Sequence, residues 1–163
     1  MKKILEPYAA YNYWANSLLT GAVGKLDEEK VHREIISSYR SIAKTILHMW
    51  DAESIWWQRV KLADTLEIPS LVFDGNTEAL LKGLTQQSLL WKEWIAASRE
   101  PALEHEFIYR NTRKEQFKQP VAEVAHHLFN HQTYHRGQLI TMLRQVGEEH
   151  VPSTDYILFL RKK

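Results

Sequence analysis

The spacing of the apolar residues constrains the fold of this chain more than any other feature of its sequence. Apolar side chains recur mostly every three or four positions, the period of one face of an α-helix, rather than every second position as in a half-buried strand. Glycine and proline, which interrupt helices, number only six and five in 163 residues. The sequence therefore predicts an all-α or nearly all-α domain.

Four long segments carry this helical period, and capping residues suggest where each begins and ends. The expected boundaries are 1–26, from the candidate caps Ser37-Ser38 to Val60, from Asn76 to Ser98, and from Pro120 to Val146. Before the last segment, Phe107 and Tyr109 alternate with polar residues and Phe117 lies in a return segment, which predicts a short β-hairpin that turns near Asn111-Thr112. The tail, 151–163, is expected to pack across the bundle as a last turn or strand.

Composition excludes several classes of function. The chain has no cysteine, which excludes thiolate metal ligands, cysteine nucleophiles and disulfides. A net charge of +1 argues against nucleic acid as a partner. No run of ~18 apolar residues predicts a membrane span, and no apolar stretch near the amino terminus predicts a signal peptide. We therefore expect a single cytoplasmic domain over residues 1–163, with no membrane partner.

One stretch of the last helical segment, HHLFNHQTYHRGQL, is rich in candidate metal ligands, because it contains half of the histidines of the chain. The apolar residues around it define a stripe whose centre passes through His131 and His135, while His127 lies ~80° away on its shoulder and His126 lies opposite. Buried imidazoles one turn apart need partners, and a divalent cation that accepts a lone pair from each would supply one. The alternative is a pair of core histidines bonded to carbonyl groups or water.

Two imidazoles need at least one further protein ligand to hold a metal ion. Among the other histidines only His48 falls inside a strong helical segment, at the edge of its apolar stripe, where it is either a ligand or an ordinary boundary residue. A di-iron bundle is a further alternative, because Glu29-x-x-His32 and Glu123-x-x-His126 match its ligand spacing. Glu123 and His126 project away from the apolar stripe, however, and Glu29 lies in a segment without clear helical period, so the di-iron alternative is disfavoured.

A set of motifs links the chain to a known family. They are Tyr11-Asn12-Tyr13-Trp14-Ala15-Asn16, His48-Met49-Trp50-Asp51, His127-x3-His131-x3-His135-Arg136-Gly137-Gln138 and Asp155-Tyr156-Ile157. With these motifs in this order, the chain resembles the DinB-like, or DinB/YfiT, superfamily over nearly its whole length. The resemblance implies a four-helix bundle with long crossover connections and a divalent metal held by His48, His131 and His135. Asp51 lies one turn after His48, where it either orients an imidazole or is simply a solvated charge on the helix.

Three neutral nitrogen ligands would leave the ion its full charge and open coordination positions, as in catalytic rather than structural zinc sites. The resemblance implies a metal-dependent enzyme that acts on a small molecule, either a hydrolase using metal-bound water or an S-transferase using a low-molecular-weight thiol. The alternative is a non-catalytic metal-binding protein that takes part in a stress response or in interactions with other molecules. Zinc or nickel is expected first, with iron or manganese as the alternatives; imidazole suits zinc, nickel, copper and iron alike, so the ligands alone leave the choice open.

The tryptophans allow two interpretations. Four of them either wall an apolar pocket around the metal or belong to the plain core, and these are Trp14, Trp56, Trp91 and Trp94. Trp50 and Trp57 lie on the outer shoulder of the second segment, which together with the resemblance predicts a homodimer. A central position of this helix is the alternative.

Overall fold

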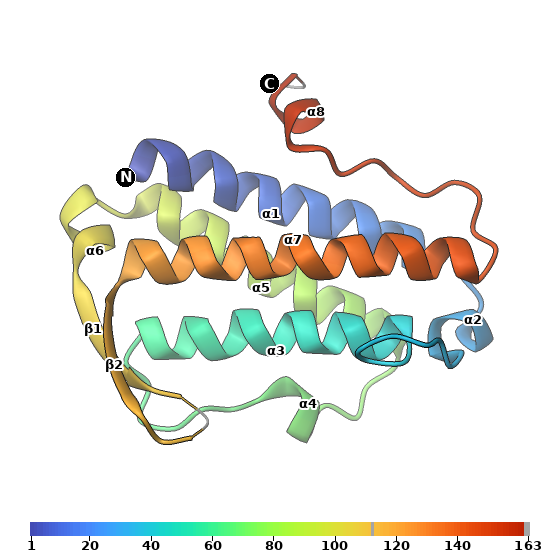
Figure 1. Cartoon of the computed structure of the whole chain (residues 1–163), viewed down its shortest axis with the longest axis horizontal. Helices are drawn as coiled ribbons and strands as arrows, with labels where there is room; N and C mark the ends of the chain where they lie inside the picture. Colours follow the sequence, from blue (N-terminus) through green and yellow to red (C-terminus); the bar gives the residue numbers. More distant parts are fainter. Residues whose placement is uncertain (112, 162–163) are drawn as a thin grey trace.

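Four long helices dominate the computed structural model, which describes residues 1–111 and 113–161 (Figure 1). They are α1 (Lys2–Val23), α3 (Ile42–Val60), α5 (Thr77–Ala97) and α7 (Val121–Gln145). Helices α1 and α3 each pack mainly against α5 and α7, and they meet each other through the hydrogen bonds from Asn12 and Asn16 to Glu53. The predicted four-helix bundle is therefore confirmed.

The connections of the bundle include the predicted long crossover. In Figure 1, α1 and α7 run in one direction and α3 and α5 in the other, so that the chain returns along the whole bundle between the end of α3 and the start of α5. The short helix α4 (Pro69–Val72) lies in this crossover, α2 (Glu28–His32) connects α1 to α3, and α6 (Glu100–Glu104) follows α5. These three short helices were not predicted, because an element of one turn is too short to display a helical period.

The predicted ends of the helices are partly correct. Asn76 caps α5 as expected, since its side chain accepts a hydrogen bond from the backbone N–H of Ala79. The prediction of Ser37-Ser38 as caps is wrong, because α3 begins after Ser41, whose hydroxyl accepts from the backbone N–H of Lys44. The first helix ends at Val23 rather than at residue 26.

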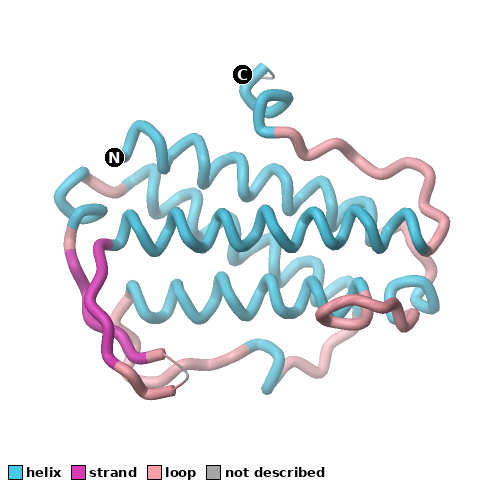
Figure 2. The backbone as a smooth tube through the Cα atoms, in the orientation of Figure 1, coloured by secondary structure: helices cyan, strands magenta, loops and turns pink. Residues whose placement is uncertain are grey.

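The hairpin and the tail both pack on the bundle as short elements. Strands β1 (Glu106–Arg110) and β2 (Gln116–Pro120) pair antiparallel, with Tyr109 opposite Phe117. The hairpin that they form lies at one end of the bundle (Figure 2). The predicted turn includes Thr112, which lies outside the described residues. The tail forms one short helix, α8 (Tyr156–Arg161), and the Tyr156 ring packs edge-on against Tyr11 at 4.9 Å. Residues 162–163 also lie outside the described part.

A layer of buried polar side chains divides the core. One apolar cluster fills each end of the bundle, and a set of buried polar residues contributed by all four long helices lies between the two clusters. The layer consists of Asn12 and Asn16 from α1, Glu53 from α3, Ser88 from α5, and Gln132 and Arg136 from α7. The prediction that His131 and His135 mark the centre of the buried stripe of α7 needs correction. Gln132 and Arg136 occupy that centre, and the two histidines lie at its edge toward α3.

Trp50 and Trp57 are both half-buried and pack against other parts of their own chain. Trp50 packs edge-on against Phe73, and its ring lies directly over Gly83 of α5. Trp57 packs against Trp91 and Trp94, also of α5. These contacts within the chain account for part of both side chains, which weakens the argument for a partner surface there, and the homodimer stays a prediction. In the part of the chain that the structure describes, no helix combines the length and the hydropathy that crossing a membrane would need.

Candidate metal centre

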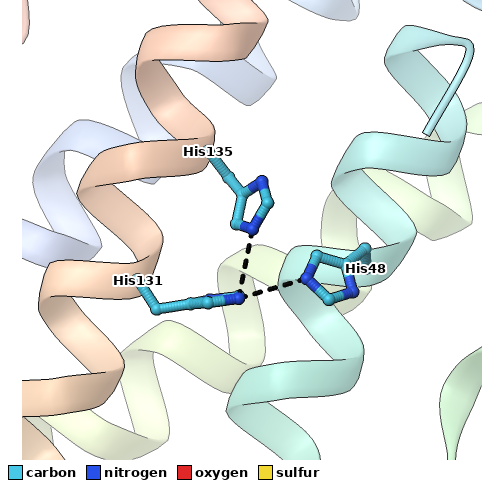
Figure 3. A group of neighbouring side chains, drawn as sticks. All are labelled: His48, His131 and His135. Atoms are coloured by element: carbon cyan, nitrogen blue, oxygen red, sulfur yellow. Dashed lines mark hydrogen bonds between the residues drawn. The ribbon is translucent and has the colours of Figure 1, made fainter. Parts of the chain in front are cut away.

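Three imidazoles converge between α3 and α7 (Figure 3). The Nε2 atom of His131 lies 3.1 Å from Nε2 of His48 and 3.1 Å from Nε2 of His135. One ligand atom from each ring can be chosen so that all three lie within 4.8 Å of one another. His131 and His135 are one turn apart on α7 and differ by ~40° in direction, so both can face the antiparallel α3, which supplies His48. The structure thus brings together the three residues that the sequence proposed.

The hydrogen bonds around the cluster test whether these rings suit a cation. His135 Nδ1 lies 2.8 Å from Oε1 of Gln138, and because an amide oxygen only accepts, Nδ1 carries the proton and Nε2 presents a lone pair. His131 Nδ1 is buried and has no hydrogen-bond partner among the described residues. Three converging ring nitrogens cannot all satisfy one another through hydrogen bonds, since a neutral imidazole has one N–H. A cation that accepts their lone pairs fits this arrangement.

The electrostatic surroundings keep the three rings neutral. Burial, together with a smaller effect from the neighbouring His135, lowers the pKa of His48 to about 4. Burial also lowers the pKa of His131 to about 4, with smaller effects from His135, His48 and His127. The pKa of His135 is lowered by burial as well, although its hydrogen bond to Gln138 acts in the opposite direction. Neutral imidazole is the form that donates a lone pair to a metal ion.

Two tyrosines cover the cluster. The Tyr39 ring stacks on His48 at 4.0 Å between ring centres with an interplanar angle of 16°, and it meets His135 edge-on at 5.6 Å. Tyr134 packs edge-on against His135 at 5.0 Å. Asp51, a candidate to orient an imidazole, instead accepts a hydrogen bond from the backbone N–H of Ser70 at 2.8 Å. The side chain that holds a ligand ring is Gln138.

The remaining candidates from the sequence lie outside the cluster. His126 and His127 are exposed, and the His127 ring centre is 6.3 Å from that of His131. Glu123 is exposed on the same outer side of α7, as expected when the di-iron alternative was disfavoured. Trp91 is fully buried core, whereas Trp56 meets the His127 ring at 5.9 Å.

The polar layer beside the cluster is the part of the site that sequence reasoning missed. The Glu53 carboxylate accepts hydrogen bonds from Asn12 Nδ2 at 2.8 Å, from Asn16 Nδ2 at 3.2 Å and from Ser88 Oγ at 2.8 Å. Arg136 Nη1 donates to the amide oxygens of the same two asparagines at 2.7 and 3.1 Å. Each asparagine therefore bridges a buried cation to a buried carboxyl group. Burial raises the pKa of Glu53 to about 7, although these partners oppose the shift.

This layer also fixes the backbone beside the ligands. Gln132, which follows His131, donates from Nε2 to the carbonyl of Met49, which follows His48, at 2.8 Å. The bond ties α7 to α3 next to the histidine cluster. Polar residues four apart on apolar stripes, Asn12 and Asn16 on α1 and Gln132 and Arg136 on α7, were the signal that could have revealed the layer.

Comparisons with known proteins identify the family of the chain. The family model described as "DinB family" matches residues 1–163. Protein DinB of Bacillus subtilis (strain 168) is 30% identical, over 92% of this chain and 90% of that protein. A crystal structure of a DinB-like protein (YjoA) from Bacillus subtilis superimposes with a TM-score of 0.66 at 13% identity, covering 91% of this chain and 97% of that one, a similarity of fold alone. The chain belongs to the DinB family.

Proposed function

We propose that this protein binds one divalent metal ion through Nε2 of His48, His131 and His135 and is a metal-dependent enzyme acting on a small molecule. The observation that carries the proposal is the convergence of these three ring nitrogens, with ligand atoms within 4.8 Å of one another. The orphaned Nδ1 of His131 and the lowered pKa values of His48 and His131 support it, because both indicate rings suited to a cation.

A bound ion would supply Lewis acidity toward a water molecule or a small thiol, which corresponds to a hydrolase or to an S-transferase. Zinc or nickel is proposed ahead of iron or manganese, since a given set of nitrogen ligands generally binds the later first-row divalent ions more tightly than manganese or iron. The chain's own residues prepare the site for this chemistry. Gln138 fixes the tautomer of His135, and Tyr39 shields one face of His48 from water.

Elemental analysis of the protein purified without added metal tests the first half of the proposal. We expect about one equivalent of a divalent ion per chain, lost in His135→Ala and kept in His126→Ala, an exposed residue of the same helix. Protein that purifies metal-free and takes up no zinc, nickel or manganese at micromolar concentrations would contradict it.

Activity screens of the loaded protein test the second half. Hydrolase activity is assayed with esters and amides as substrates. Transferase activity is assayed with alkylating electrophiles in the presence and in the absence of a low-molecular-weight thiol. We expect turnover that His135→Ala abolishes, and its dependence on thiol distinguishes the transferase from the hydrolase. A filled site without turnover would favour the non-catalytic metal-binding alternative.

A further inference from the structure

A row of rings leads from the histidine cluster to the hairpin. The His127 ring lies next to His131, Trp56 meets His127 at 5.9 Å, and Tyr109 of β1 meets Trp56 edge-on at 4.9 Å. A cavity of about 190 Å³ is lined by Trp56, Tyr109 and His127 among others, and Tyr109 also lines a neighbouring cavity of about 330 Å³ that contains Arg59 and Arg110. We call these two cavities together the aromatic groove.

At the end of the aromatic groove that is distant from His127, the Arg59 guanidinium has fewer polar partners than it can bind. The Arg59 guanidinium lies over the Trp56 ring at 4.7 Å and over the Tyr109 ring at 5.3 Å, and its Nη2 donates to the carbonyl of Arg110 at 2.9 Å. Its Nε is buried without a hydrogen-bond partner in the part of the chain that the structure describes. Within that part, neither Arg59 nor Arg110 forms an ion pair with a carboxylate. A partly buried guanidinium in this state gains from an anionic partner.

The groove lies along the same side of α3 as the histidine cluster. Arg59 follows His48 by eleven residues on the continuous helix α3, which places it ~16 Å along the axis and within ~20° of the same side. Glu123 lines the groove at its His127 end, so its carboxylate disfavours an anion there. The charges therefore differ between the two ends, and they orient an elongated ligand with its anionic end at Arg59.

We propose that the aromatic groove binds an elongated small molecule with a carboxylate or phosphate at Arg59, an aromatic or apolar body along Trp56 and Tyr109, and its reacting group toward the histidine cluster. The assignment of this molecule as the substrate rests on the proposed function. Binding of the anionic end does not, because Arg59 and Tyr109 take no part in the histidine cluster.

Binding of three matched probes to metal-stripped protein tests the proposal. The probes are 2-naphthoate, 2-naphthyl phosphate and the neutral 2-naphthamide, and their dissociation constants are measured by calorimetry. We expect one or both anions to bind at least about tenfold tighter than the amide, a preference of ~1.4 kcal/mol. Which anion binds tighter distinguishes a carboxylate from a phosphate ligand.

Variants locate the preference. Arg59→Met should abolish it, Arg59→Lys should keep part of it, and the exposed Arg110→Gln should weaken it without loss of thermal stability. Lys61→Met is the matched control, since Lys61 also lies over two rings, Trp57 and Trp94, but does not line the groove. Equal binding of anions and amide to the wild type, survival of the preference in Arg59→Met, or an equal loss in Lys61→Met overturns the proposal.

The outcome is separable from that of the metal proposal. His135→Ala should keep the preference for the anions, and its loss there would overturn the placement of the anionic end at Arg59. If the protein shows the preference for the anions but binds no metal, only the proposed function is contradicted. If it binds metal but shows no preference for the anions, only the present inference is contradicted.

Discussion

At the scale of single residues, the direction of each imidazole on α7 decides whether it can share an ion with His48. Replacing any one of His48, His131 and His135 with alanine should strongly reduce metal affinity, because the two remaining imidazoles hold a divalent ion weakly. The reduction should exceed the ~10–100-fold that is typical when a residue hydrogen-bonded to a ligand, rather than the ligand itself, is removed. His127→Ala should have a smaller effect, since its exposed ring only neighbours His131. Competition titrations with a chromophoric chelator measure all four.

His126→Ala is the control for these titrations and should bind metal as the wild type does, because His126 is exposed and packs against Tyr8 of α1. If His127→Ala abolished binding while His135→Ala left it intact, α7 would be rotated by one position from the register in Figure 3.

The lowered histidine pKa values predict a pH dependence at the same scale. In the unfolded chain these histidines take up protons near ~6.5, whereas in the folded, metal-free protein His48 and His131 do so near about 4. Between these values the unfolded state binds more protons, so these residues make the fold less stable as pH falls from ~6.5 to 4. Urea unfolding of the metal-free His48→Ala variant should show a shallower loss than the wild type over this range. Equal slopes would mean that His48 titrates alike in both states.

At the scale of the elements, a glycine sets how closely α3 and α5 pack. A Cβ atom added to Gly83 would lie 2.6 Å from the Cη2 atom of Trp50, closer than packed atoms tolerate. We expect Gly83→Ala to destabilise the fold by ~1–3 kcal/mol through overpacking, although alanine is the better helix former by ~1 kcal/mol. Chemical denaturation of Gly83→Ala in the wild-type and Trp50→Leu backgrounds measures both effects. The substitution should become neutral or stabilising once the Trp50 ring is removed, and an unchanged cost in that background would contradict the packing explanation.

The polar layer makes a second prediction about elements, because Glu53 joins α3 to α1 and α5. Burial raises its pKa from 4.5 to about 7, so the folded state holds a proton that the unfolded state has already released. The stabilisation from this proton is fully present below 4.5 and is lost as pH rises toward 7. Relative to Glu53→Gln, the wild type should therefore lose up to ~1.4 kcal/mol of unfolding free energy per pH unit across this window. A pH-independent difference between the two proteins would mean that Glu53 is ionised throughout and balanced by Arg136.

At the scale of the whole molecule, the sequence predicted those features that depend on residues close together along the chain. The long helices follow from apolar spacing, and the pairing of His131 with His135 follows from their separation by one turn. The polar layer has only a partial local signature, since the spacing of Asn12 and Asn16 on α1 marks polar residues on an apolar stripe but not their partners. Glu53 finds its partners on α1 and α5, and Arg136 finds its own on α1, through the packing of the helices. The contact of His48 with His131, 83 residues away, likewise depends on how α3 and α7 pack, and only the family resemblance anticipated it.

The same packing predicts how metal affects the stability of the folded chain. Because the ligands come from two helices that only the folded state brings together, an ion that binds there stabilises that state by mass action. At a free zinc concentration of about 100 times the dissociation constant, the unfolding free energy should rise by ~2.7 kcal/mol for a single site. Urea unfolding of metal-stripped protein with and without buffered zinc measures this rise.

Two comparisons decide whether the ion acts within one chain. The rise should vanish in His135→Ala and persist in His126→Ala, since only the former loses a ligand. The increase on adding zinc should also be independent of protein concentration, because all three proposed ligands belong to one chain. The predicted homodimer would instead make the unfolding midpoint depend on protein concentration with or without zinc. A concentration dependence that appears only with zinc would mean that the ion bridges two chains, contrary to the site in Figure 3.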